Sequence, residues 1–128
     1  MQVGNWGAPP PFEIKDIGNN KKGFFFRVGF TSEGFTSENV MIFSYYNGSF
    51  KSVLELKNAY MDNSGDCDPN TPNDCWQYSY TLTPIKERGE YYDLLFSKRG
   101  QVKQNGKLSN VNVQEKYGFV NGKYIKKD

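Results

Sequence analysis

The sequence predicts an antiparallel all-β domain, and three features support this fold class. Aromatic residues, which favour strands, are abundant, with 10 Phe, 9 Tyr and 2 Trp among 128 residues. Alanine, the strongest helix former, occurs only at Ala8 and Ala59. In several segments apolar and polar side chains alternate with the period of two that is typical of strands. The length suits one domain, which we expect over residues 12–128, after an extended leader over residues 1–11 that contains three consecutive prolines.

The predicted strands follow one another with turn signals between them. A nearly continuous apolar run at residues 40–46 ends at Asn47-Gly48, and two more Asn-Gly pairs lie further along, at residues 105–106 and 121–122. Asn-Gly is the strongest sequence signal for a two-residue β-hairpin, because both residues accept positive φ angles. Strands are expected at residues 24–30, 40–46, 50–56, 76–82 and 91–96.

The order of strands and turns occurs twice, over residues 12–56 and 76–127. In this alignment Gly34 corresponds to Gly100, and the Asn-Gly pair at residues 47–48 corresponds to the pair at 121–122. Two four-stranded units give about eight antiparallel strands, which must pack face to face or close into a ring to bury their aromatic side chains. We therefore predict two duplicated four-stranded units, arranged like propeller blades or as a β-sandwich.

Cys67 and Cys75 bracket a polar loop that is rich in Asp, Asn and Pro. Free cysteines prefer apolar burial, whereas two cysteines around such a loop indicate a disulfide. A disulfide needs an oxidising compartment, so we expect a periplasmic or secreted protein whose export signal has been removed ahead of Met1. The sequence has no run of about 20 apolar residues that would predict a membrane-spanning helix.

The residue types argue against catalysis. The chain has no histidine, which excludes Ser-His-Asp and Cys-His nucleophilic sites as well as histidine metal sites. Glu87, Glu90 and Asp93 could supply the two carboxylates of a glycoside hydrolase. Charged residues in and beside a polar turn are, however, usually just solvated. We therefore expect no catalytic residues and no enzymatic activity.

Acidic residues make the cysteine loop a candidate for a charged contact. Oxygen ligands at alternate positions suit Ca²⁺, but the loop lacks the residue order of an EF-hand, and Asx and Pro residues form turns for their own backbone reasons. We predict no cofactor, with Ca²⁺ at Asp62, Asp66 and Asp68 as the alternative. A loop stiffened by a disulfide could instead insert Asp66, Asp68 and Asp74 into a basic target cleft, because rigidity lowers the entropy cost of binding.

Exposed aromatic side chains are the other candidates for binding, and we select Tyr45, Trp76 and Tyr91. Such rings form hot spots for a protein partner or platforms for a polysaccharide. Residues 86–128 carry 10 basic and 5 acidic side chains, which would attract an acidic partner, although exposed Lys on edge strands can serve only to prevent aggregation. A nucleic acid partner is not expected, because the net charge is only +2 and export is predicted.

Short motifs in the chain resemble two groups of proteins. The segment 12–20, with the apolar strand after it, resembles the FG-GAP or VCBS type of propeller-blade repeat. Those repeats bind Ca²⁺ through spaced Asp residues, whereas residues 19–22 here are two Asn and two Lys. Because two blades cannot form a propeller, this resemblance implies a sandwich-like arrangement or a dimer. A group of small periplasmic proteins of Gram-negative bacteria, some of them immunity proteins against secreted toxins, is similar at residues 62–67, 92–95 and 117–124.

Together these observations predict an exported, non-enzymatic binding protein that inhibits or neutralises a protein target, such as a toxin or a lytic enzyme. The alternative is a carbohydrate-binding or surface-adhesion module. The first requires a surface that fits a protein, and the second requires a pair of exposed, coplanar aromatic rings.

Overall fold

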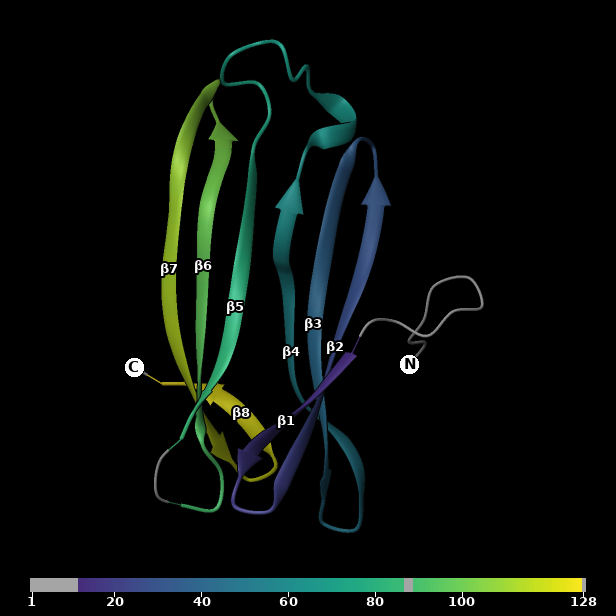
Figure 1. The fold of residues 1–128 in the computed structure, drawn as a ribbon, viewed down its shortest axis with the longest axis vertical. Helices are drawn as coiled ribbons and strands as arrows, with labels where there is room; N and C mark the ends of the chain where they lie inside the picture. The colour runs from purple at the N-terminus through teal and green to yellow at the C-terminus, as the bar shows by residue number, and fades with distance from the viewer. Residues whose placement is uncertain (1–11, 87–88, 128) are drawn as a thin grey trace.

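A computed structural model describes residues 12–86 and 89–127, which form an all-β fold, as predicted. Eight strands pair with their sequence neighbours in a single antiparallel sheet of order β1 to β8 (Figure 1). No helix within these two ranges is long and apolar enough to cross a membrane. The strands are β1 (Phe12–Gly18), β2 (Lys21–Ser32), β3 (Phe35–Tyr46), β4 (Ser49–Asp62), β5 (Gln77–Ile85), β6 (Asp93–Gln104), β7 (Lys107–Val120) and β8 (Lys123–Lys126).

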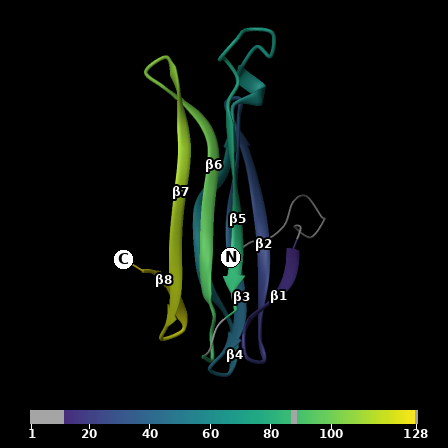
Figure 2. The same ribbon diagram turned by 60° about the vertical axis from the view of Figure 1, so that its left-hand side comes forward.

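The sheet divides into two halves, β1–β4 and β5–β8, because β4 and β5 pair through only two residue pairs. These are Met61 with Tyr78 and Asp62 with Gln77. Beyond them β4 and β5 separate, so that β2, β3 and β4 lie on one side of the molecule and β5, β6 and β7 on the other (Figure 1). In the view turned by 60°, β6 and β7 lie together at one side of the molecule (Figure 2). The two halves thus correspond in strand number to the two predicted four-stranded units.

The predicted Asn-Gly hairpins are confirmed. Asn47, Asn105 and Asn121 all have positive φ angles, of 52°, 52° and 50°, and each precedes a glycine with positive φ. The predicted match of Gly34 to Gly100 is wrong, however. Gly34 lies in the turn between β2 and β3, whereas Gly100 lies within β6 opposite Val111. By strand order Gly34 corresponds to Gly106, which lies in the turn between β6 and β7.

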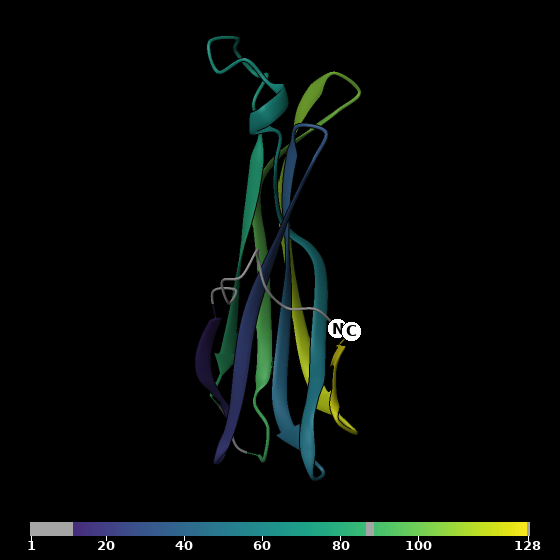
Figure 3. The same ribbon diagram turned by 90° about the vertical axis from the view of Figure 1, so that its right-hand side faces the viewer.

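The loop between β4 and β5 closes one end of the molecule, which we call the stapled end. The predicted disulfide between Cys67 and Cys75 lies in this loop, and a short 3₁₀ helix, η1 (Ser64–Asp66), precedes it. The hairpins β2–β3 and β6–β7 lie at the same end (Figure 3). Gly65 donates a backbone hydrogen bond of 3.1 Å to the carbonyl of Gly34, which ties the loop to the β2–β3 turn.

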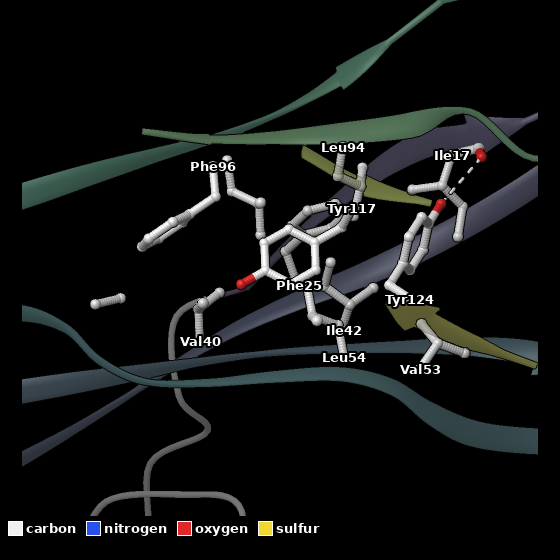
Figure 4. Close-up of a cluster of buried hydrophobic side chains, with 12 residues drawn as sticks. Ile17, Phe25, Val40, Ile42, Val53, Leu54, Leu94, Phe96, Tyr117 and Tyr124 are labelled. Carbon is white, nitrogen blue, oxygen red and sulfur yellow. Dashed lines mark hydrogen bonds between the residues drawn. The ribbon is translucent and has the colours of Figure 1, made fainter. Parts of the chain in front are cut away.

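At the opposite end, β1 joins the segment that precedes β6. The Tyr92 N–H donates to the Ile17 carbonyl at 2.7 Å, and the Asn19 N–H donates to the Glu90 carbonyl at 3.0 Å. From β8, the Tyr124 hydroxyl lies 3.0 Å from the Tyr92 carbonyl and 3.4 Å from the Ile17 carbonyl (Figure 4). These contacts connect the first strand to the second half of the sheet.

The hydrophobic core lies between the two halves (Figure 4). Ile42 and Val53 come from the first half and Leu94 from the second, and all three have an exposed fraction of 0%. Burying side chains of this size contributes about 1.5–3 kcal/mol each. The core therefore holds together two half-sheets that share few backbone hydrogen bonds.

The Tyr124 hydroxyl provides a test of the closure at the end opposite the staple. Tyr124→Phe should lower the free energy of unfolding by about 1–2 kcal/mol, because the Tyr92 carbonyl, 3.0 Å from the hydroxyl, loses its donor. Urea denaturation would measure the change. Tyr117→Phe is the matched control, because Tyr117 is also buried and forms no hydroxyl hydrogen bond within the described residues. Equal effects of the two substitutions would contradict the assignment.

Candidate binding surface

The outer face of the β1–β4 half-sheet carries an unusual set of apolar side chains. Successive side chains of a strand point to opposite faces. Phe25 on β2 and Val40 and Ile42 on β3 point into the core, so their neighbours along each strand point outward. The strand register brings these outward residues together, because Phe12 pairs with Phe26, Phe24 with Phe43, and Tyr45 with Phe50. We call the set the aromatic face, and it comprises Phe12, Ile14, Phe24, Phe26, Phe43, Tyr45 and Phe50. Met41 pairs with Phe26 in the same register but is only 5% exposed, so we do not count it.

Four members of the aromatic face are largely exposed. The exposed fractions are 50% for Phe12, 54% for Ile14, 61% for Tyr45 and 58% for Phe50. Aromatic side chains have an area of about 150–250 Å² each, so Phe12, Tyr45 and Phe50, together with Ile14, present on the order of several hundred Å² of apolar surface. Patches of roughly 300–600 Å² are the largest on typical monomers, and they are often functional.

The rings of the aromatic face meet mostly edge to face. Phe26 and Phe43 are inclined at 87°, Phe24 and Phe50 at 71°, and Tyr45 and Phe50 at 79°. Only Phe12 and Phe26 stack, at 27° with centroids 5.5 Å apart. The arrangement produces an uneven surface of ring edges and ring faces, in which a partner's apolar side chains can insert.

Of the aromatic residues selected from the sequence, only Tyr45 belongs to this face. Tyr91 is partly buried at the end opposite the staple, where its ring stacks on Phe119 with centroids 3.7 Å apart. Trp76 lies beside the stapled loop between Phe35 and Tyr78, with ring centroids 6.0 and 6.4 Å away. The structure does not bring Tyr45, Trp76 and Tyr91 into one site.

The sequence contained a signal for the aromatic face that our sequence analysis did not use. Phe24, Phe25 and Phe26 are consecutive, so β2 must present phenylalanine on both faces of the sheet. Alternation along β1 separates Phe12 and Ile14 from Glu13 and Lys15. Phenylalanine on both faces of one strand, beside a neighbouring strand with two apolar side chains on one face, predicts an exposed apolar face.

Hydrogen bonds within the stapled loop occupy two of its three selected carboxylates. The Asp68 carboxylate accepts from the Thr71 hydroxyl at 2.7 Å and from the Asn70 N–H at 2.9 Å, and these bonds lower its pKa. The Asp74 carboxylate accepts from the Asp68 N–H at 2.6 Å and lies 3.4 Å from the Lys103 ammonium, which together lower its pKa. Asp68 and Asp74 therefore stabilise the loop, and Asp66 is exposed.

The carboxylates considered for Ca²⁺ do not form a cluster. Within the described ranges, no three or more Asp, Glu or Cys side chains gather where a metal ion could be held. Burial tends to raise the pKa of Asp62, but hydrogen bonds from the Tyr60 hydroxyl and from the Ser64 N–H and hydroxyl lower it overall. The Asp62 carboxylate thus accepts hydrogen bonds from the nearby residues Tyr60 and Ser64.

Two of the three carboxylates considered for catalysis are paired with lysines. Glu90 lies 3.2 Å from the Lys21 ammonium, and Asp93 accepts a hydrogen bond of 2.7 Å from Lys127. Glu87 lies outside the described residues. A lysine ammonium group therefore balances the negative charge of Glu90 and of Asp93.

Two surface hollows lie near the residues described above. One, of about 520 Å³, lies beside the disulfide and is lined by Trp76, Pro69 and Gln101 among others. The other, of about 290 Å³, lies between β1 and β5, and we call it the β1–β5 cleft. Its polar lining includes Glu13, Lys15, Arg27 and Tyr80.

Comparison of the chain with protein-family models, with curated proteins and with solved structures finds no match. The geometry of the molecule must therefore carry the argument about function. Its most distinctive surface is the aromatic face.

The disulfide should contribute measurably to stability. In the chain-entropy account, cross-linking residues separated by 8 positions stabilises the fold by roughly 2–3 kcal/mol. Cys67→Ser/Cys75→Ser should lower the free energy of unfolding in urea by this amount. Dithiothreitol should destabilise the wild-type protein and leave the variant unchanged. A variant as stable as the oxidised protein would show that the loop is held by its hydrogen bonds alone.

Tyr80 predicts how stability depends on alkaline pH. Burial raises the pKa of Tyr80 to about 12, above the ordinary value of 10.0. The folded state therefore favours the neutral phenol, and this contribution is complete below pH 10 and is lost as the pH rises from 10 through 12. The urea midpoint should fall over this interval, and less steeply for Tyr80→Phe. Identical slopes for the two proteins would contradict the shift.

Proposed function

We propose that this chain is an exported, non-enzymatic binding protein that attaches to a protein target through its aromatic face. The observation that carries the proposal is the group of apolar side chains on a solvent-facing sheet surface, four of them at least half exposed. Exposing such side chains to water costs free energy that a partner can recover by covering them. Aromatic residues are also enriched among the residues that dominate the energy of protein interfaces.

The ring geometry favours a protein partner over a polysaccharide. A sugar platform presents flat ring faces, whereas the rings here meet at 71°, 79° and 87°. Most members are also phenylalanines, which lack the hydroxyl or indole N–H that could bind sugar hydroxyls. An uneven surface made mainly of phenylalanine side chains suits the side chains of a second protein.

The finer proposal is that the partner is a toxin or lytic enzyme and that binding neutralises it. It rests on the resemblance of short segments to small periplasmic immunity proteins, which remains a prediction. The disulfide between Cys67 and Cys75 supports export, because such bonds persist in oxidising compartments. A rigid β scaffold with a large preformed surface also suits an inhibitor, because little ordering is needed on binding.

The proposal is tested by capturing a partner and then mapping its contact. The immobilised, oxidised protein would be exposed to lysate and secreted fractions of its own organism and of competing organisms, with mass spectrometry of what is retained. Tyr45→Ser/Phe50→Ser should weaken binding of the captured protein at least 30-fold, because interface hot spots contribute about 2 kcal/mol or more each. The affinities would be measured by biolayer interferometry with purified components.

Two control variants make the test specific. Val120→Ser/Ile125→Ser removes apolar side chains of similar exposure, 49% and 51%, from the other half of the sheet, and binding should remain within about twofold. Asp66→Asn removes an exposed charge from the stapled loop and should also leave binding unchanged. If Asp66→Asn abolishes binding while Tyr45→Ser/Phe50→Ser does not, the stapled loop is the contact and the aromatic face is not. Retention of polysaccharide alone would support the carbohydrate-binding alternative.

A further inference from the structure

We propose that the β1–β5 cleft binds an extended peptide segment of the protein partner as an added β-strand, hydrogen-bonded to β1 on one side and to β5 on the other. The cleft is lined by residues of both strands, including Glu13 and Lys15 of β1 and Tyr80 and Leu82 of β5. This proposal rests on the proposed function, because it names the part of the partner that the protein holds.

The first supporting observation is the free edge of β1. Within the described part of the chain, β1 pairs with β2 along Phe12–Asp16, and only its far end, at Ile17–Asn19, bonds to the segment before β6. Alternate residues of an antiparallel strand direct their N–H and C=O groups away from the paired neighbour. Alternate residues of segment 12–16 thus present backbone groups that β2 does not use to an incoming strand.

The second observation is the free edge of β5. From Ser79 to Ile85 this strand pairs with β6 alone, because its pairing with β4 ends at Tyr78. Pro84 lies in this segment, and proline is tolerated in a strand where its nitrogen faces a free edge. Tyr80 and Leu82 alternate in step with Pro84, so their N–H and C=O groups face the cleft.

The direction of the two strands makes one added strand compatible with both edges. Every strand of the sheet is antiparallel to its sequence neighbours. The odd-numbered strands β1 and β5 therefore run the same way along the molecule, as Figure 1 shows. A peptide that runs in the opposite direction is antiparallel to both and can use the hydrogen-bonding groups of both, as in β-strand addition.

The side chains around the cleft define the chemistry of the peptide. Lys15 lies 3.7 Å from Glu13 and 5.1 Å from the centre of the Phe25 ring. Arg27 is exposed and has no ion-pair partner within the described ranges. An acidic residue of the peptide that points inward would pair with Arg27. Outward-pointing residues would extend the row of Phe12 and Ile14, which favours apolar side chains there. The expected ligand is therefore a strand that alternates acidic and apolar residues.

The experiment selects peptides without assuming a sequence. A phage-displayed library of random nonapeptides would be selected on the immobilised, oxidised, full chain. The expected result is enrichment of peptides that alternate acidic and apolar residues. The best one, made synthetically, should shift the amide NMR signals of β1 and β5 and bind Arg27→Glu at least tenfold more weakly. Arg99→Glu is the matched control, because Arg99 is exposed on β6 and does not line the cleft; its affinity should stay within twofold.

Backbone methylation then tests the added strand itself. N-methylation of the odd-numbered residues of the selected peptide, and separately of the even-numbered residues, should each weaken binding at least tenfold, because the two sets face different edges. If N-methylation of only one of the two sets weakens binding, the peptide bonds to only one strand edge, and the two-edge proposal is overturned. Failure to enrich any peptide, or affinity unaffected by Arg27→Glu, would overturn the site altogether.

The outcomes separate this proposal from the proposed function. If a captured partner depends on Tyr45 and Phe50 while no peptide is enriched, the aromatic face stands and the strand site fails. If a peptide binds the cleft but the captured partner tolerates Tyr45→Ser/Phe50→Ser, the strand site stands without the aromatic face.

Discussion

The structure depends on how its two half-sheets are joined. Backbone hydrogen bonding between β4 and β5 extends over only two residue pairs. Within the described residues, the other backbone link between the half-sheets is the short contact of β1 with the segment before β6. Everything between these two ends is held by side-chain packing around residues such as Ile42 and Leu94. The disulfide and the Tyr124 hydroxyl therefore stabilise the two ends between which the core forms.

This construction explains why the protein has both a cleft and an apolar outer face. Because β4 and β5 diverge, the inner face of β1 and β2 is only partly covered, and Glu13 and Lys15 of β1 and Arg27 of β2 remain accessible there. Charges on that inner face act against unspecific edge pairing, while Phe12 and Ile14 on the opposite face stay exposed. β1 is thus the border between the cleft and the aromatic face, so a partner can use both surfaces at once.

Local signals were the most reliable part of the sequence. The Asn-Gly hairpins, the alternation in β2 and β5, and the cysteines around a polar loop predicted the corresponding structures, because each depends on residues close together in the chain. The alignment of Gly34 with Gly100 failed because it relied on spacing alone. Gly100 lies within β6, close to β5, where a Cβ atom would lie 2.4 Å from the Cα of Tyr78, so packing between strands explains that glycine, not a turn.

The sequence by itself determined the all-β class, the number of strands and the disulfide, because these follow from local propensity and short-range geometry. Only the tertiary structure decided which face of each strand is buried. Tyr45 and Tyr91 both lie in aromatic segments of the sequence, yet Tyr45 is 61% exposed and Tyr91 packs against Phe119. The difference arises from strand register and from where the second half-sheet covers the first, and both depend on contacts between residues far apart in the chain.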